Sequence, residues 1–234
     1  MLLHHTAPWK NTIAFRLTFN LEKLNFHRTH PGLLHFAEHM MFVSTAKFTQ
    51  RDLGDKFSLL FDIMGATTSV TNLNINVRCH KADLPQVIEV LRDMIHTWKC
   101  PRTLFESEKK IILDEYKNNY ESLDFTRGVL ALAKHIPELK HRGIGTKPDL
   151  QELTYGHVKE AKKIWEVMLK NAPRDLIVVT ESLTKSETKL LNSLINLKTL
   201  GKPAAPKDII KPAKLINTNT LSAVQFSASS ISPF

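Results

Sequence analysis

Glycine and cysteine are both scarce in this chain. Of its 234 residues, 8 are glycine, and no glycine-rich loop of the kind that cradles phosphate is present. Two cysteines, Cys79 and Cys100, have the wrong spacing for a cysteine-based zinc site. They are able to form one bridge, but we prefer two reduced, partly buried thiols in a cytosolic protein. These shortages argue against nucleotide binding through a phosphate loop and against a cysteine-held metal.

Long apolar runs and dense basic runs are also missing. No stretch approaches the roughly 20 apolar residues that a membrane span needs. The N-terminal residues Met1 to His5 lack the basic and apolar regions of a secretory signal, so we expect a cytoplasmic protein without a membrane span. The formal net charge is +9, but the lysines are dispersed, and neither an RNA-recognition motif nor a Cys/His finger occurs. We therefore expect no nucleic-acid partner.

The remaining composition, 42% hydrophobic and 24% charged, is that of a globular protein. Apolar residues alternate with polar ones over Ile13–Phe19 and Leu73–Cys79, which predicts two strands, and an apolar β-branched run predicts a third at Leu176–Thr180. Helical spacing or buried apolar composition predicts helices over Leu33–Val43, Arg51–Ile63, Leu84–Trp98, Thr103–Leu123, Arg127–Ile136, His157–Leu169 and Leu183–Leu197. The expected fold class is α+β, with a mixed or antiparallel sheet covered by helices mainly on one face.

The last part of the chain has a different composition. Pro203, Pro206 and Pro212 lie among lysines after Gly201, which is typical of a linker. The segment Leu221–Phe226 is predicted as a final strand. We therefore expect a domain over residues 1–200, followed by a linker and C-terminal strand over residues 201–234.

The segment Gly32–Phe42 carries the main chemical signal. On a helix, His35, Glu38 and His39 project from one face, because positions three and four apart share a side. Two imidazoles one turn apart can bind a single Zn²⁺, and a carboxylate beside them can take a proton from water at the metal. The bland alternative is a helix in which two histidines and a glutamate happen to be adjacent.

A catalytic zinc site also needs a third protein ligand. Glu108 and Glu115 are seven positions apart, so they lie within ~20° of the same face of the predicted helix. One of these carboxylates can complete the metal shell while the other sits just outside it. For Glu108, a surface pairing with Lys109 or Lys110 is the alternative.

The motif His-x-x-Glu-His resembles the inverted zinc motif of the pitrilysin and insulin-degrading peptidases, the inverzincins. Glu115 follows His39 at about the distance of that family's glutamate ligand, and Glu108–Glu115 is similar to its Glu-Lys…Glu helix. The resemblance implies that His35, His39 and Glu115 bind one Zn²⁺, that Glu38 is the general base and that Glu108 is an auxiliary carboxylate. The segment Thr67–Ser69 departs from the family's Asn-Ala pair.

The family resemblance also implies an activity and a partner. We expect a zinc metalloendopeptidase that cleaves extended, unstructured peptides, which bind along an edge strand comprising Ser69, Val70, Thr71 and Asn72. Because this chain resembles only the zinc-bearing half of such enzymes, we expect a homodimer or a heterodimer with another half-size subunit. A non-catalytic assembly subunit is the alternative, and the four intact site residues favour the enzyme.

Overall fold

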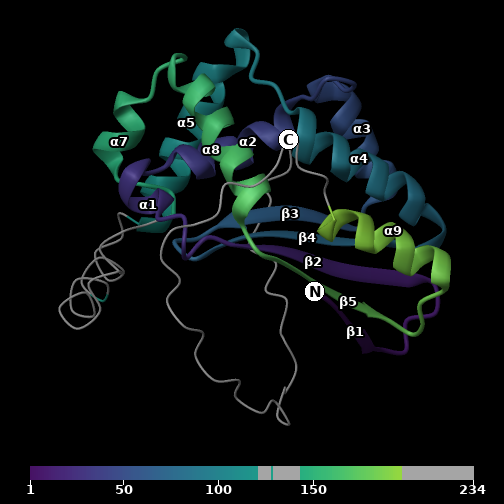
Figure 1. The fold of residues 1–234 in the computed structure, drawn as a ribbon. Helices are drawn as coiled ribbons and strands as arrows, with labels where there is room; N and C mark the ends of the chain where they lie inside the picture. Colours follow the sequence, from purple (N-terminus) through teal and green to yellow (C-terminus); the bar gives the residue numbers. More distant parts are fainter. Residues whose placement is uncertain (121–127, 129–142, 197–234) are drawn as a thin grey trace. The chain divides into compact units, whose positions relative to one another are not determined.

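The computed structural model describes residues 1–120, 128 and 143–196. Within them one mixed sheet has the order β1-β5-β2-β4-β3 (Figure 1). Its strands are β1 (Leu2–Thr6), β2 (Thr12–Asn20), β3 (Ile63–Thr68), β4 (Asn72–His80) and β5 (Arg174–Thr180). Strand β1 pairs with β5 in parallel, and the other three pairings are antiparallel. Strands β1 and β3 therefore form the two edges of the sheet.

The helices of this part of the chain cover one face of the sheet (Figure 1). They are α1 (Phe26–Thr29), α2 (Leu33–Val43), α3 (Gln50–Leu60), α4 (Leu84–Thr97), α5 (Arg102–Tyr120), α7 (Lys147–Glu152), α8 (His157–Asn171) and α9 (Lys185–Ile195), with a 3-10 turn at Lys81–Asp83. This arrangement confirms the predicted α+β class with a mixed sheet. None of the described helices combines the length and the hydrophobicity that crossing a bilayer requires.

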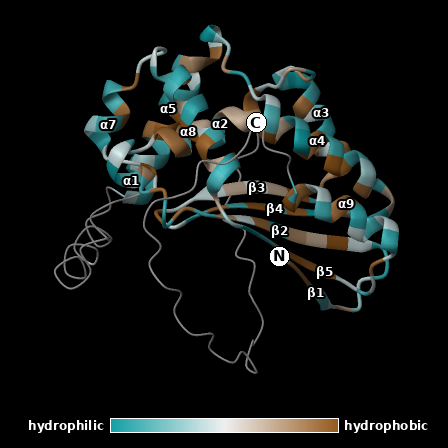
Figure 2. Ribbon diagram, in the orientation of Figure 1, coloured by the Kyte–Doolittle hydropathy of each residue, from teal (hydrophilic) through white to brown (hydrophobic). Residues whose placement is uncertain are grey.

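Strand alternation decides which side chains meet the helices. In the centre of the sheet Phe15 pairs with Val77 on β4 and with Val178 on β5, and all three side chains are buried beneath the helices. On the opposite face Arg16 donates from Nε to Asn76 Oδ1 at 2.6 Å. Apolar colouring accordingly covers much of β2 and β5, α8 carries both apolar and hydrophilic residues, and α7 is mostly hydrophilic (Figure 2). The helix-facing side of the sheet is thus one wall of the core.

Most of the predicted elements are present with small shifts at their ends. Helix α2 has the predicted bounds, but the helix expected over Arg51–Ile63 ends at Leu60 rather than at Ile63. Sheet pairing takes over there: the Asp62 amide donates to the Arg78 carbonyl at 2.8 Å, and β3 follows at once. Helix α5 begins at Arg102, one residue before the predicted start at Thr103.

The sequence did not predict β1, α1, β3 or α7. The region around Pro148, which lies in none of the predicted helices, forms α7, and Thr146 and Asp149 make a capping box at its start. The Thr146 hydroxyl accepts from the Asp149 amide, and the Asp149 carboxylate accepts from the Thr146 amide at 2.8 Å. Pro148 suits the first turn of a helix, where its missing N–H costs nothing.

Two units are distinguished by their internal contacts, Met1–Leu200 and Gly201–Phe234. The second unit lies outside the described residues, so the linker and strand expected over 201–234 stay predictions. The helix expected at Arg127–Ile136 lies outside them too, apart from one helical residue at position 128. Cys79 and Cys100 are free, buried thiols, as expected.

Candidate metal centre

Helix α2 presents the motif from within the core. Gly32 precedes it with φ +77°, and a Cβ on Gly32 would lie 2.8 Å from the Ile144 carbonyl oxygen, so a side chain has no room there. Helix α2 packs against α8, α5 and β3. His35 and Glu38 are only 5% and 6% exposed. The polar face of α2 is therefore enclosed rather than solvated.

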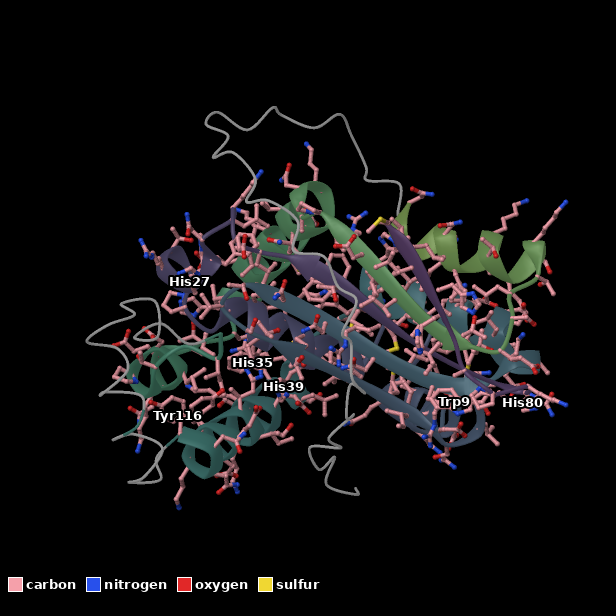
Figure 3. All side chains as sticks on the ribbon, turned by 90° about the horizontal axis from the view of Figure 1, so that it is seen from below. Trp9, His27, His35, His39, His80 and Tyr116 are labelled. Carbon is pink, nitrogen blue, oxygen red and sulfur yellow. The ribbon has the colours of Figure 1, made fainter. Side chains whose placement is uncertain are left out.

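His35, His39 and Glu115 converge at one point between α2 and α5. Glu115 Oε2 lies 3.4 Å from His35 Nε2 and 3.3 Å from His39 Nε2. One donor atom from each of the three residues lies within 4.8 Å of the other two. The imidazole centroids are 4.7 Å apart, and Figure 3 shows the two rings side by side. The structure thus brings these three residues together although His35 and Glu115 are 80 positions apart in the sequence.

Glu108 lies behind His39 rather than at the point of convergence. Its Oε2 is 3.7 Å from His39 Nδ1, the nitrogen that faces away from Glu115. The Glu108 side chain is 7% exposed, which excludes the alternative of a surface pair with Lys109 or Lys110. Lys109 instead donates to the Gln151 and Leu153 carbonyls at the end of α7. A carboxylate on the second nitrogen of a ligating histidine orients the ring and fixes its tautomer.

The pKa values of the two histidines shift in opposite directions although the residues are one turn apart. Burial, reinforced by the charge of His39, lowers the pKa of His35 to about 3. Burial acts in the same direction on His39, but hydrogen bonds to Glu108 and Glu115 outweigh it and raise the pKa of His39 to about 9. Before a metal binds, His35 is therefore neutral at pH 7, and His39 carries a proton between two carboxylates.

The two carboxylates of the motif also differ from each other. Burial raises the pKa of Glu38 to about 7, although hydrogen bonding from Thr68 opposes it. For Glu115, burial is outweighed by the hydrogen bond from His39 and by the charges of both histidines, which lower its pKa. Glu115 is thus held as an anion, the form that binds a cation, while Glu38 is poised to gain or lose a proton near neutrality.

Glu38 has one partner that the sequence did not reveal. The Thr68 hydroxyl donates to Glu38 Oε2 at 2.5 Å. Thr68 is the last residue of β3, on the helix-facing side with Met64 and Ala66. In the sequence, the alternation of Met64, Ala66 and Thr68 indicates that Thr68 faces the helices. This signal is weak because the strand also contains Gly65 and two threonines.

The donor set fits a zinc ion. Two imidazole nitrogens and one carboxylate oxygen are the three protein ligands of many catalytic zinc sites. His35 is neutral and Glu115 is anionic, as binding requires, and the second nitrogen of His39 already has a carboxylate partner. Of the residues that the structure describes, these three alone form a His/Cys/Asp/Glu cluster able to hold a metal.

The predicted edge strand is wrong in its position. Ser69, Val70 and Thr71 form the turn between β3 and β4, and Asn72 is the first residue of β4, which lies inside the sheet. Ser69 closes this turn, since its amide donates to the Asn72 carbonyl at 2.8 Å. The edge beside the motif is β3, Ile63–Thr68.

An α+β domain with a helix-borne His-x-x-Glu-His motif and a distant glutamate facing it is typical of the inverted-motif metallopeptidases. The model of the insulinase family, peptidase family M16, matches residues 8–137 of this chain. This match spans more than half of the 234 residues, so the chain belongs to that family. The resemblance seen in the sequence is confirmed at the level of the family.

Two relatives among curated proteins match parts of the chain. It is 25% identical over 126 residues to the mitochondrial-processing peptidase subunit beta of Neurospora crassa. It is 27% identical over 93 residues to the ubiquinol-cytochrome-c reductase complex core protein I of Euglena gracilis. The matches cover 53% and 40% of this chain but only 26% and 19% of those proteins. By their names, both relatives are components of larger assemblies.

Solved structures share the fold at low identity. The first half of the periplasmic protease PqqL from Escherichia coli has a TM-score of 0.71 at 20% identity, over 89% of this chain and 46% of that one. A peptidase M16 inactive domain from Pseudomonas fluorescens has a TM-score of 0.68 at 14% identity, over 91% and 51%. Because a protease and a domain described as inactive share this fold, activity has to be argued from the site residues.

Proposed function

We propose that this chain is a zinc-dependent endopeptidase, with one Zn²⁺ held by His35, His39 and Glu115. The observation that carries the proposal is the convergence of their three donor atoms within 4.8 Å, beside a buried glutamate on the same helix. A charged cluster in an apolar helix is costly unless it is paired or binds a metal. The family membership supports a peptidase, and the intact motif favours an active one over a non-catalytic subunit.

Zinc with three protein ligands lowers the pKa of water in its open position to about 7. Residues of this chain would accept the proton of that water and transfer it. Glu38 accepts it and later returns it to the leaving amine, for which a carboxyl with a raised pKa is suited. Glu108 holds the His39 ring by its second nitrogen. In this proposal, each buried ionisable group of the cluster binds the metal, transfers the proton or orients a ligand.

The substrate proposed here is an extended peptide that pairs with β3. This strand is an edge of the sheet, so one side of its backbone is available to pair with another strand. Its last residue, Thr68, touches Glu38, which places the end of this edge at the motif. A peptide bound along Ile63–Thr68 would be delivered toward Glu38 in a fixed register.

The proposal includes a second, peptidase-like half. Among the described residues, no lysine or arginine forms an ion pair with Glu38 or Glu115. Preorganised donors at the site of developing charge are a major part of catalysis, and here they would come from a partner. This chain spans 46% and 51% of the two structures described above. A second copy or a different half-size subunit would suit this role.

The experiment that tests the proposal combines metal analysis with peptide cleavage by the full chain. We expect about one zinc per chain and cleavage of an unstructured fluorogenic peptide, which a chelator abolishes and added zinc restores. Specific activity should rise with chain concentration if two copies complete the site, or on addition of a partner subunit. Zinc-loaded chain that cleaves no peptide at any concentration, alone or with its co-purified partner, would favour the non-catalytic alternative.

A further inference from the structure

The hydrogen bond between Thr68 and Glu38 connects two parts of the site that the sequence separates by 30 positions. The donor–acceptor distance is 2.5 Å, in the range of strong hydrogen bonds to carboxylates. Glu38 is 6% exposed, so water competes little for its oxygen atoms. Thr68, at the end of the edge strand, therefore restrains the orientation of the carboxylate through its hydroxyl, with a further hydrogen bond from its backbone N–H.

The backbone that carries Thr68 is itself held in place. Thr68 pairs with Leu73 in the β3–β4 ladder, and the adjacent Ser69 amide closes the turn on Asn72. Because side chains alternate along a strand, position 68 faces α2 when Met64 is in the core. A slip of one residue would turn the hydroxyl to the opposite face and break the bond to Glu38.

A glycine segment braces both ends of this contact. A Cβ on Gly143 would lie 2.5 Å from the Thr68 carbonyl oxygen, so the backbone at position 143 packs directly on the end of β3. A Cβ on Gly145 would lie 2.9 Å from the Gly32 nitrogen, where α2 begins. Residues 143–145 therefore contact both the strand that carries the donor and the helix that carries the acceptor.

We propose that Thr68 is a positioning residue that fixes the Glu38 carboxylate and links its orientation to the register of the peptide-binding edge strand. The inference rests on the proposed function and adds a residue to it. The Thr68 hydroxyl donates to Oε2 of Glu38 and so restrains the carboxylate that exchanges the proton during the reaction. A peptide that pairs with β3 contacts the same strand whose last side chain sets the base.

The physical reason for a large effect is geometric. A carboxylate on a long side chain rotates unless its oxygen atoms are held, and a displacement of about 1 Å in a reacting group costs about 100-fold in rate. Thr68 is neither a metal ligand nor the base, so its loss should leave the metal in place. The expected signature is a fall in kcat without a change in zinc content or KM.

The test compares Thr68→Val with Thr68→Ser and with a matched control. Valine keeps the shape of threonine but removes the donor, and we expect kcat to fall about 10- to 100-fold with KM and zinc content unchanged. Serine keeps the hydroxyl and should restore most of kcat. Thr18→Val is the control, because Thr18 also donates to a side-chain oxygen of this sheet, Asn74 Oδ1 at 2.8 Å, on the opposite face. It should retain wild-type kcat.

A crystal structure of Thr68→Val gives a readout that does not depend on activity. We expect the Glu38 carboxylate to leave its wild-type orientation while His35, His39 and Glu115 stay in place. An unmoved Glu38, or a kcat equal to that of the wild type, would overturn the role of Thr68. Should the wild type cleave no peptide, the proposed function fails on its own, and the orientation of Glu38 in the two structures still decides whether Thr68 positions it.

Discussion

The helix side and the strand side of the site are built in different ways. On the helix side, His35 and His39 lie one turn apart on α2, and α5 supplies Glu115 and Glu108 two turns apart. On the strand side, Glu38 is held by one residue of β3, Thr68, through its hydroxyl and its backbone N–H. Helical spacing sets the pairs within α2 and within α5, and packing of α2 against α5 brings them together, whereas the strand side depends on the contact between β3 and α2. Changes on the helix side should therefore affect the metal, and changes on the strand side should affect turnover alone.

The largest effect is expected on the helix side. His35→Ala or His39→Ala removes one of three ligands, so the protein should lose its zinc and all activity. The measurement is zinc per chain by elemental analysis after dialysis, followed by peptide cleavage. His5→Ala is the control, because His5 lies exposed on β1 away from the cluster. Equal zinc content in His35→Ala and His5→Ala would remove the distinction between the two sides.

Glu108→Gln should have an intermediate effect, again through the metal. Glutamine keeps the volume of glutamate but weakens the contact with His39 Nδ1, which should lower zinc affinity or turnover about 10- to 100-fold. Competition with a chromophoric chelator measures the affinity, and circular dichroism checks that the fold is retained. Wild-type affinity and turnover in this variant would show that the contact at 3.7 Å contributes nothing to function.

Zinc affinity should depend on pH through His39 on the helix side of the site. Since burial and the two carboxylates leave the pKa of His39 at about 9, zinc must displace a proton from this residue at lower pH. The association constant should therefore rise about tenfold per pH unit between roughly pH 6 and pH 8, and level off above pH 9. Chelator competition at several pH values measures this slope. A constant affinity over that range would contradict a protonated His39.

The smallest expected effect concerns the brace on the strand side. In Gly143→Ala the new Cβ would lie 2.5 Å from the Thr68 carbonyl oxygen, so we expect the free energy of unfolding to fall by about 1–3 kcal/mol and kcat to fall with zinc retained. Gly54→Ala is the matched control. Position 54 is in α3 with no atom near its added Cβ, so alanine there should stabilise by about 1 kcal/mol. Chemical denaturation of both variants measures the difference.

A free energy of unfolding of Gly143→Ala that is no lower than that of the wild type would show that residues 143–145 do not brace β3. The same result combined with an unchanged kcat would show that Thr68 holds Glu38 without help from residues 143–145.

The sequence was sufficient for the elements whose signal is local. Helix α2 and strands β2 and β4 follow from apolar periodicity, and the shared face of His35, Glu38 and His39 follows from helical spacing alone. The spacing of Glu108 and Glu115 indicated two carboxylates on one face. Only the family resemblance distinguished the ligand from the auxiliary group, and the structure places Glu115 at the convergence and Glu108 behind it.

The strand side was not predictable in the same way. The position of a strand within a sheet depends on partners far along the chain, so the alternating pattern of β4 did not show that it is an interior strand. The turn at Ser69–Thr71 was assigned to the edge because the short strand β3 carries glycine and threonine in place of strong β formers. Thr68 was overlooked for the same reason.

We expect the two sides of the site to have separable roles, with the metal held by the helices and Glu38 serving only the proton. Glu38→Gln, compared with His35→Ala in one series, tests it most directly. Glutamine at position 38 removes the base and leaves His35, His39 and Glu115 untouched, so zinc content should equal that of the wild type while peptide cleavage is lost. Loss of zinc from Glu38→Gln to the level of His35→Ala, or retained cleavage, would contradict a role of Glu38 in proton transfer alone.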